Sequence, residues 1–263
     1  MLIDTHCHLN FPDYQKDIDE VIKRSIKAGV TKIICVSSSL ADSQKAIAIS
    51  KQYPGTVYAA VGIHPHQTDP ENTDSVSAQL DQLAKLVQAK EVVAIGECGL
   101  DFSTAPPLEK DRADEEQKYL FTKQIELAQK YHLPLIVHSR KSFDEVISII
   151  RDLSSINQLR GVLHCYTGGR SGVTKINELG FFFGLDGNLT YDQGLQNVTK
   201  LLPLEKIILE TDSPFLSPVP LRGQRNEPKN VTLINDYLAK IKNINTDEMA
   251  KITSQNAQLL FHI

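Results

Sequence analysis

The stretch "EVVAIG" at residues 91–96, followed by "ECGLD" at 97–101, contains the two features that decide the fold. Residues 92–95 are a short apolar run with β-branched side chains, which is typical of a strand buried on both faces. Glu97 and Asp101 follow at the end of this run. In parallel α/β proteins, the residues at the carboxyl ends of the strands build the active site. The pattern therefore indicates a buried strand that delivers polar side chains to a site.

Apolar runs of this kind occur eight times along the chain. They lie at residues 2–4, 32–36, 57–63, 91–96, 133–138, 160–165, 180–185 and 206–210. Stretches with helical spacing separate them. In residues 15–28 the apolar side chains share one face and Gly29 ends the helix. Residues 114–131 repeat this pattern, with Asp114 as the expected N-cap.

Strands that alternate with helices predict a parallel sheet covered by helices. Eight such units in 263 residues predict a (β/α)8 TIM barrel, in the α/β class. A doubly wound open sheet is the alternative. Since no linker or repeat divides the chain, we expect a single domain over residues 1–263. The last helical stretch, 247–261, is expected to pack outside the barrel.

The composition is that of a globular protein, with 41% apolar and 23% charged residues. The net charge of −4 argues against a protein that coats nucleic acid, but it allows an enzyme with a local basic pocket. Without a signal-peptide pattern or a long apolar run, the chain is expected to be cytoplasmic and to have no membrane span. Four widely separated cysteines beside apolar runs predict buried, reduced thiols.

Six of the eight histidines lie at the ends of the apolar runs. They are His6, His8, His64, His66, His138 and His164. Carboxylates occupy the same kind of position: Glu97 and Asp101 follow the fourth run, and Glu210 and Asp212 end the eighth. Histidines scattered over a surface would not have this bias. We therefore expect a site at the carboxyl ends of the strands.

His6 and His8 form a pair whose spacing suits a metal ion. Along a strand, residues i and i+2 point to the same face, so both side chains point into the barrel. Two imidazoles placed in this way bind one divalent cation. Alone, the pair is equally typical of hydrogen-bonded side chains near a loop. Further polar residues at the same end would be costly to bury without metal, and these are Glu97, His138, His164 and Asp212.

The motifs that carry these residues resemble those of TatD-type metal-dependent hydrolases, in the amidohydrolase superfamily. They are, in order, "IDTHCHLN", "GIHPH", "GECGLDF", "HSR", "HCYTGG", "ETDSP" and "RNEP". The resemblance covers nearly the whole chain and implies a TIM barrel. It also implies a deoxyribonuclease that uses divalent metal ions to shorten single-stranded DNA from its 3′ end.

The resemblance implies a site for two divalent ions, with Mg²⁺, Mn²⁺ or Zn²⁺ as candidates. It assigns His6, His8 and Asp212 to the first ion, His138 and His164 to the second, and Glu97 to both. Two ions ~3.5–4 Å apart lower the pKa of a bound water and stabilise charge on phosphoryl oxygens. Asp212 would accept the proton of the attacking water, and Glu97 would hold the two ions together.

Substrate contacts are expected from residues that follow the strands. His64 would contact the phosphate or the leaving oxygen, and a cap on a Pro-containing turn is its alternative role. Arg140, Arg222 and Asn226 lie in loops that we expect to overhang the site. Arginine forks suit phosphate, whereas an ordinary solvated loop is the alternative for these residues.

Several residues near the site have less specific expectations. His66 is expected in a surface turn, Asp101 either beside the metal ligands or as a loop cap, and Glu227 in a pair with an arginine. Three aromatic residues are candidates for stacking on a base, with core packing as the alternative. They are Phe102, Tyr166 and Phe215.

Three functions remain open at this point. The first is hydrolysis of single-stranded DNA by a monomeric enzyme. The second is hydrolysis of another ester or an amide, such as an aminoacyl or lactone bond, at the same metals. The third is a metal-binding or interaction protein without catalysis, and the complete ligand set argues against it. An arginine-rich pocket would favour phosphate, and an apolar pocket would favour the second function.

Overall fold

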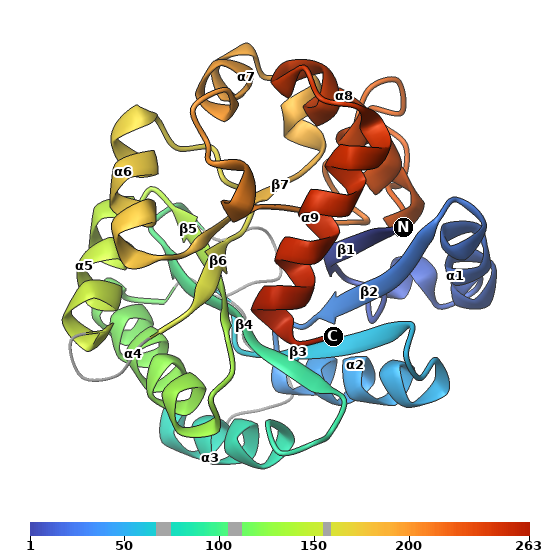
Figure 1. Cartoon of the computed structure of the whole chain (residues 1–263). Coiled ribbons are helices and arrows are strands. Elements are labelled where there is room, and N and C mark those ends of the chain that lie inside the picture. Colours follow the sequence, from blue (N-terminus) through green and yellow to red (C-terminus); the bar gives the residue numbers. More distant parts are fainter. Residues whose placement is uncertain (67–74, 105–111, 155–158) are drawn as a thin grey trace.

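The chain, a computed structural model described over residues 1–66, 75–104, 112–154 and 159–263, forms a barrel of eight parallel strands (Figure 1). The strands are β1 (Leu2–Cys7), β2 (Val30–Val36), β3 (Val57–Val61), β4 (Val92–Asp101), β5 (Leu135–Arg140), β6 (Gly161–Leu163), β7 (Phe182–Leu185) and β8 (Ile207–Leu209). They neighbour one another in chain order. Each of the eight predicted apolar runs contains or overlaps a strand.

Helices of the described residues surround the strands. They are α1 (Ile18–Lys27), α2 (Leu40–Gln52), α3 (Val76–Leu86), α4 (Asp114–Tyr131), α5 (Phe143–Ser154), α6 (Arg170–Leu179), α7 (Gln193–Thr199), α8 (Val231–Lys242) and α9 (Thr246–Phe261). Short 3-10 helices lie at η1 (Pro12–Tyr14), η2 (Gly187–Thr190), η3 (Leu204–Lys206) and η4 (Pro228–Asn230). The predicted bounds of α4 are correct, but its N-cap is Ala113, and Asp114 is the first helical residue.

The barrel closes where the chain beyond β8 meets β1. A parallel bridge joins Cys7 and Ser213, and the backbone N–H of His8 donates to Ser213 O over 2.7 Å. The N–H of Asp212 likewise donates to His6 O over 2.8 Å. The (β/α)8 prediction is thus confirmed, and the open-sheet alternative is wrong. Closure also places the metal-ligand candidates of the first and last strands side by side.

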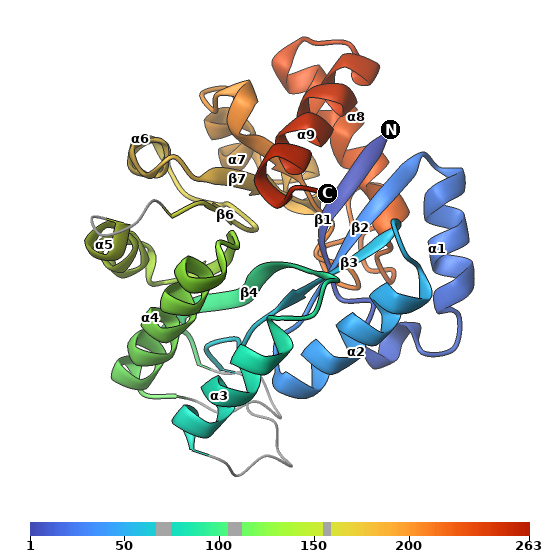
Figure 2. The same cartoon turned by 60° about the horizontal axis from the view of Figure 1, so that its bottom comes forward.

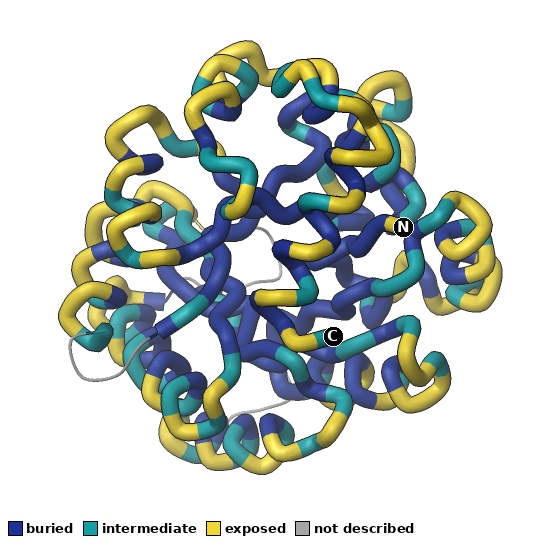
Figure 3. Tube along the Cα trace, in the orientation of Figure 1, coloured by how far each residue is buried: buried dark blue, intermediate teal, exposed yellow. Residues whose placement is uncertain are grey.

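Two apolar layers flank the strands, as alternating side chains require. One lies between strands and helices and includes Cys7, Cys35 and Cys98, which are buried free thiols as predicted. The other fills the barrel with small and branched side chains such as Ile3 and Ala60. Figure 3 shows the strands buried and the outer faces of the helices exposed.

Helix α9 packs outside the ring of strands, as expected, but in a position that the sequence did not specify. It does not join the outer ring but lies across the amino-terminal opening of the barrel (Figures 1 and 2). Ala257, Leu260 and Phe261 pack against the side chains inside the barrel, and Ser254 Oγ donates to Met1 O over 3.1 Å. The apolar face of α9 therefore closes the end of the barrel opposite the predicted site.

No helix among the described residues is long and apolar enough to cross a membrane.

Candidate metal centre

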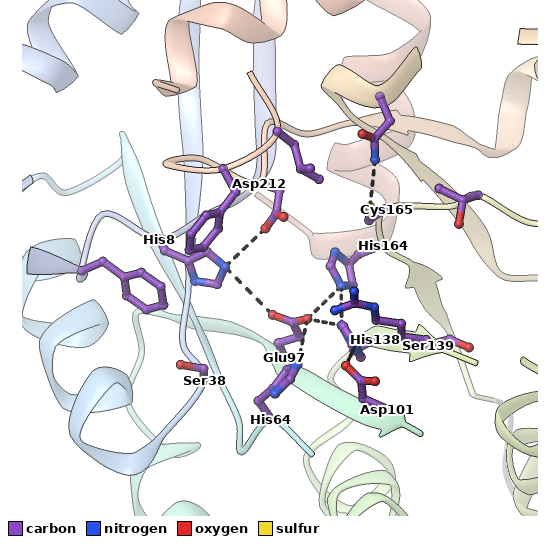
Figure 4. A pocket seen from close by; sticks show the side chains of 16 residues that line it. His8, Ser38, His64, Glu97, Asp101, His138, Ser139, His164, Cys165 and Asp212 are labelled. Atoms are coloured by element: carbon purple, nitrogen blue, oxygen red, sulfur yellow. Dashed lines mark hydrogen bonds and ion pairs between the residues drawn. The ribbon is translucent and has the colours of Figure 1, made fainter. Parts of the chain in front are cut away.

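The six predicted metal ligands meet at the carboxyl ends of the strands. They come from β1 (His6), β4 (Glu97) and β5 (His138), and from the residues directly after β1 (His8), β6 (His164) and beyond β8 (Asp212). Five of them line a cavity of about 590 Å³, and His6 is fully buried beside them. Figure 4 shows Glu97 between His8 and Asp212 on one side and His138 and His164 on the other.

The first cluster consists of His6, His8, Asp212 and one oxygen of Glu97. The Nε2 atoms of His6 and His8 are 3.3 Å apart. Asp212 Oδ1 lies 3.5 Å from His6 Nε2 and 3.4 Å from His8 Nε2, and Glu97 Oε2 lies 3.5 Å from His6 Nε2. Three residue types that bind divalent metal thus direct their ligand atoms at one point.

The second cluster uses the other oxygen of the same carboxylate. Glu97 Oε1 lies 2.7 Å from His138 Nδ1 and 2.8 Å from His164 Nε2. The two imidazole nitrogens are 3.2 Å apart. Glu97 therefore offers one oxygen to each cluster, which is the arrangement that a carboxylate bridging two metals requires.

The donor chemistry fits divalent cations better than a hydrogen-bonded network. His8 Nδ1 lies 3.0 Å from Val36 O, so Nδ1 carries the proton and Nε2 presents a lone pair to the cluster. In addition, the cluster nitrogens of His6 and His8 are 3.3 Å apart, and those of His138 and His164 are 3.2 Å apart. Nitrogens that face each other at such distances are satisfied by a shared cation, and mixed imidazole and carboxylate donors suit Zn²⁺ and Mn²⁺.

The protonation states of His6 and Asp212 agree with metal binding. Burial, followed by the nearby His164, lowers the pKa of His6 to about 4, so this imidazole is neutral at pH 7. Burial alone would raise the pKa of Asp212, but the hydrogen bond with His8 and the neighbouring imidazoles outweigh it and lower that pKa. The first cluster thus combines a neutral imidazole with an ionised carboxylate, which are the forms that bind metal.

His64 lies beside the second cluster, where substrate can reach it. Its Nε2 is 3.7 Å from Glu97 Oε1, and its side chain lines the cavity. The backbone N–H of His66 donates to His64 Nδ1 over 3.3 Å, so Nε2 carries the proton. His64 therefore points an N–H group into the cavity.

Asp101 both contacts a predicted metal ligand and caps a loop, which are the two roles that the sequence left open. Its Oδ2 lies 3.2 Å from His138 Nε2, and its Oδ1 accepts from Ser103 N over 2.9 Å. His66 was expected in a surface turn, and this is wrong. It is only 2% exposed, and its Nε2 lies 2.9 Å from Ser103 O, which places it beneath the Asp101 loop.

Arg140 lines the cavity as predicted for a phosphate contact, whereas the other two predicted contacts do not. Arg222 is exposed, and its guanidinium lies 3.9 Å from the ring centre of Tyr191 instead. Asn226 is fully buried, and its side-chain amide is used within the protein. The expectation that Asn226 contacts substrate is therefore corrected.

Asn226 holds the turn that carries Asp212. Its Nδ2 donates to Thr211 O over 3.0 Å and to Phe215 O over 2.7 Å, on either side of Asp212. Its Oδ1 accepts from the N–H of Glu227 over 2.9 Å. Asp212 itself has a φ of +52°, a left-handed conformation that persists only when the surroundings enforce it. Asn226 supplies part of that enforcement.

The structure also places Glu227, the three aromatic candidates and Cys165. Glu227 accepts from Arg24 Nε over 3.0 Å, so its predicted pairing with an arginine is confirmed. Among the aromatic candidates, Tyr166 is buried against Phe183 and Phe102 is half-buried against the apolar core, so both take the packing role. Phe215 lines the cavity. Cys165 also lines it and is half-buried, unlike the other three cysteines.

Sequence reasoning missed the contribution that follows β7. Asn188 lines the cavity, and Asp186 caps η2 by accepting from Asn188 N over 2.7 Å. A signal was present, because "DGN" at 186–188 directly follows the seventh apolar run. Glu210 was noted only for its position. It is fully buried, and its Oε1 accepts from the backbone N–H of Cys165 over 2.5 Å, next to His164.

Comparison with known proteins agrees with this geometry. The profile of the family described as "TatD related DNase" matches residues 3–262. The chain belongs to this TatD family. The Bacillus subtilis "Uncharacterized metal-dependent hydrolase YabD" is 34% identical to it over 100% of both chains. Human "Deoxyribonuclease TATDN3" is 34% identical over 99% of this chain and 94% of its own length.

Solved structures of TatD proteins have the same fold. The Escherichia coli TatD homologue YjjV superposes with a TM-score of 0.88 and 30% identity, covering 100% of this chain and 98% of that one. A TatD-family hydrolase from Entamoeba histolytica gives 0.87 and 28%, covering 99% and 97%. Together with its two ligand clusters, family membership makes this TatD protein a metal-dependent hydrolase.

Proposed function

We propose that this TatD protein is a 3′→5′ exodeoxyribonuclease that hydrolyses single-stranded DNA with two divalent metal ions. The observation that carries the proposal is the position of Glu97, which presents Oε1 to one imidazole cluster and Oε2 to the other. A bridged pair of metal sites is typical of enzymes that displace a phosphoryl oxygen in line. The deoxyribonuclease name of its human relative supports the choice of DNA.

The protein's own residues divide the work of the reaction. When bound, two divalent cations lower the pKa of a water and offset charge on the phosphoryl oxygens. Asp212 is an ionised carboxylate at the open side of the first cluster, so it orients that water and accepts its proton. His64 donates its Nε2–H to a phosphoryl oxygen or to the leaving oxygen.

Arg140 brings a guanidinium group, which stays positively charged at neutral pH, to the same cavity. Its fork of N–H groups suits a non-bridging phosphate oxygen of the substrate. The net charge of −4 is compatible with this role, since the end of a strand brings only a few phosphates into the pocket.

Hydrolysis of a different ester or an amide is the second candidate. It is favoured by the apolar side of the cavity, where Phe11, Phe215 and Leu216 lie. Both reactions would use the same water and the same carboxylate. They differ in the substrate group that the pocket must bind, which is a phosphodiester in the first reaction and a carboxyl ester or an amide in the second. The DNA digestion described next distinguishes them.

The test is the digestion of 5′-labelled single-stranded DNA with Mg²⁺ or Mn²⁺ added separately. We expect a ladder that shortens from the 3′ end, that EDTA abolishes and that Asp212→Asn does not produce. A closed circular single strand has no ends and stays intact if the enzyme is an exonuclease. His132→Asn, at the exposed C-cap of α4, is the control and keeps full activity. Intact DNA together with cleavage of a carboxyl ester would overturn the proposal in favour of the second candidate.

A further inference from the structure

Phe215 is a large apolar side chain that the fold leaves open at the cavity. It is 51% exposed, whereas every other phenylalanine and tyrosine side chain except Tyr119 is buried or half-buried. Several other large apolar residues of the described chain are similarly exposed, including Tyr119 at 48%, but among them Phe215 alone lines the cavity. A single exposed apolar residue has no special meaning, whereas one at the edge of a candidate active site requires an explanation.

Phe215 continues an aromatic series that starts at a metal ligand. The ring of His8 stacks on Phe11 with centroids 4.5 Å apart and planes 16° apart. Phe215 meets Phe11 at 6.1 Å and His8 at 6.2 Å, both edge to face. Half-buried Phe11 and exposed Phe215 thus form an aromatic wall that begins at the first metal cluster and reaches solvent.

The position of this wall is fixed relative to the chemistry. Phe215 lies three residues after Asp212, and its backbone N–H donates to Asp212 O over 2.9 Å. The amide of Asn226 holds Phe215 O over 2.7 Å. One turn therefore carries both the carboxylate that faces the water and the exposed ring, so their separation does not depend on a free loop.

The opposite side of the cavity is polar. In Figure 4 Ser139 and His8 lie on opposite sides of Glu97, and Arg140 and Thr167 add further polar side chains to the lining of the cavity. A ligand that fills the cavity must therefore present an apolar, preferably flat group to one wall and a polar or anionic group to the other. A nucleotide has this division, with a flat base on one side of its sugar and a phosphate on the other.

We infer that Phe215, supported by Phe11, is the binding site for a nucleobase adjacent to the scissile phosphate, an inference that rests on the proposed nuclease function. The base stacks on the aromatic wall while its phosphate reaches the metal clusters and Arg140. Every base has a π face, so this contact accepts all four bases. It selects a nucleotide over a bare phosphodiester.

The experiment compares three 5′-labelled single strands. One is unmodified, and each of the others replaces one of the two 3′-terminal nucleotides by an abasic tetrahydrofuran residue. For the unaltered enzyme we expect kcat/KM to fall by about 5- to 150-fold for one of the two abasic strands. Phe215→Ala should lower kcat/KM on the unmodified strand by a similar factor and leave the rate on that abasic strand unchanged.

Two variants serve as controls. Phe215→Tyr keeps the aromatic face and should keep the preference for a base. Tyr119→Ala removes an equally exposed ring from α4, outside the cavity, and should change neither rate. The unchanged rate of Phe215→Ala on the abasic strand also excludes damage to the metal centre beside His8.

Each other outcome overturns the inference. Equal rates on all three strands would mean that no base is bound, and an undiminished preference in Phe215→Ala would place the base elsewhere. If the unaltered enzyme cleaves none of the strands but does cleave a carboxyl ester, the nuclease proposal itself fails. The failure of the base site alone is recognised by efficient, metal-dependent cleavage of all three strands.

Discussion

Asp101 Oδ2 lies 3.2 Å from His138 Nε2, on the far side of the imidazole ring from the 2.7 Å contact between His138 Nδ1 and Glu97. A carboxylate in this position holds the proton of a ligand histidine on Nε2 and leaves Nδ1 free to bind metal. Ser103, which donates to Asp101 Oδ1 over 2.9 Å, fixes the carboxylate in turn. The geometry of the second cluster thus depends on residues that lie outside it.

Asp101→Asn should weaken metal binding at the second cluster by about 10- to 100-fold, because it disturbs the orientation and proton position of His138. Equilibrium dialysis with Zn²⁺ or Mn²⁺ measures this as one of two sites becoming weak. Ser103→Ala removes the hydrogen bond that the Ser103 hydroxyl donates to Asp101 Oδ1 over 2.5 Å but keeps the bond from its backbone N–H, so it should have a smaller effect in the same direction. Two sites with unaltered affinity in Asp101→Asn would show that His138 needs no such support.

Asp212→Asn should lower kcat by about 10²- to 10⁴-fold, since the amide cannot accept the proton of the attacking water. Single-turnover kinetics with saturating Mn²⁺ separates this loss from a loss of metal. The far-ultraviolet circular dichroism should be unchanged, because Asp212 lies in a turn beyond β8. A rate within a factor of three of the unaltered enzyme would remove Asp212 from the role of base.

Asn226→Ala should lower both metal content and kcat, because it releases the carbonyl groups of Thr211 and Phe215 that flank Asp212. Asn256 is a matched control. Its buried Nδ2 also donates to two carbonyl groups, Leu204 O over 2.7 Å and Ile207 O over 2.8 Å, at the other end of the barrel.

Both alanine variants should lose about 1–3 kcal/mol of unfolding free energy in urea titrations, the cost of leaving buried carbonyl groups unpaired. Only Asn226→Ala should also lose metal and turnover. Equal activity in the two variants, at equal loss of stability, would reduce Asn226 to a purely structural residue.

The metal-free protein should lose stability on acidification partly through His6. The pKa of His6 is lowered to about 4 in the folded chain, below its ordinary value of 6.5. As the pH falls, the unfolded chain binds this proton first, so the contribution of His6 to stability is complete above pH 6.5 and is lost towards pH 4.

The measurement is the free energy of unfolding in EDTA at pH 7, 6 and 5. Between pH 6 and pH 5, His6→Asn should reduce the slope of unfolding free energy against pH by about 1.2 kcal/mol per pH unit. An identical slope in the variant and the unaltered protein would contradict a neutral His6 in the folded state.

Cleavage of DNA should depend only weakly on salt, because a strand end brings few phosphates to the pocket. The logarithm of kcat/KM should fall against the logarithm of salt concentration with a slope of about −0.7 for each phosphate contacted. Arg140→Gln should make this slope shallower by about 0.7, and Arg140→Lys should preserve it. Arg222→Gln, whose guanidinium lies over Tyr191, serves as the control and should leave the slope unchanged.

The sequence allowed the barrel and the ligands to be predicted because both depend on short-range patterns. Apolar runs identify strands, and the alternation of side chains places His6 and His8 on the same face. Parallel strands in chain order then bring Glu97, His138 and Asp212 together without any knowledge of loops. Each of these residues could be assigned from its position within or just after a strand.

The loops were predicted less well, because their contacts join distant parts of the chain. Asn226 has the residue type of a substrate contact, yet its amide holds a turn some fifteen residues earlier in the chain. His66 sits in a polar, turn-like stretch, but the Asp101 loop covers it. The path of α9 could not be read from its own sequence either, since an apolar helix face fits a barrel opening as well as an outer wall.

The closure of the amino-terminal opening by α9 has a practical consequence for handling the protein. The backbone oxygen of Met1 accepts a hydrogen bond from Ser254 of α9. Phe261, near the other terminus, packs against the side chains at the amino-terminal opening, so both ends of the chain lie at the closed end. Attachment to a bead or sensor surface through a linker at either terminus would leave the metal centre facing the solution. An immobilised form should therefore accept long DNA strands as readily as the free protein does.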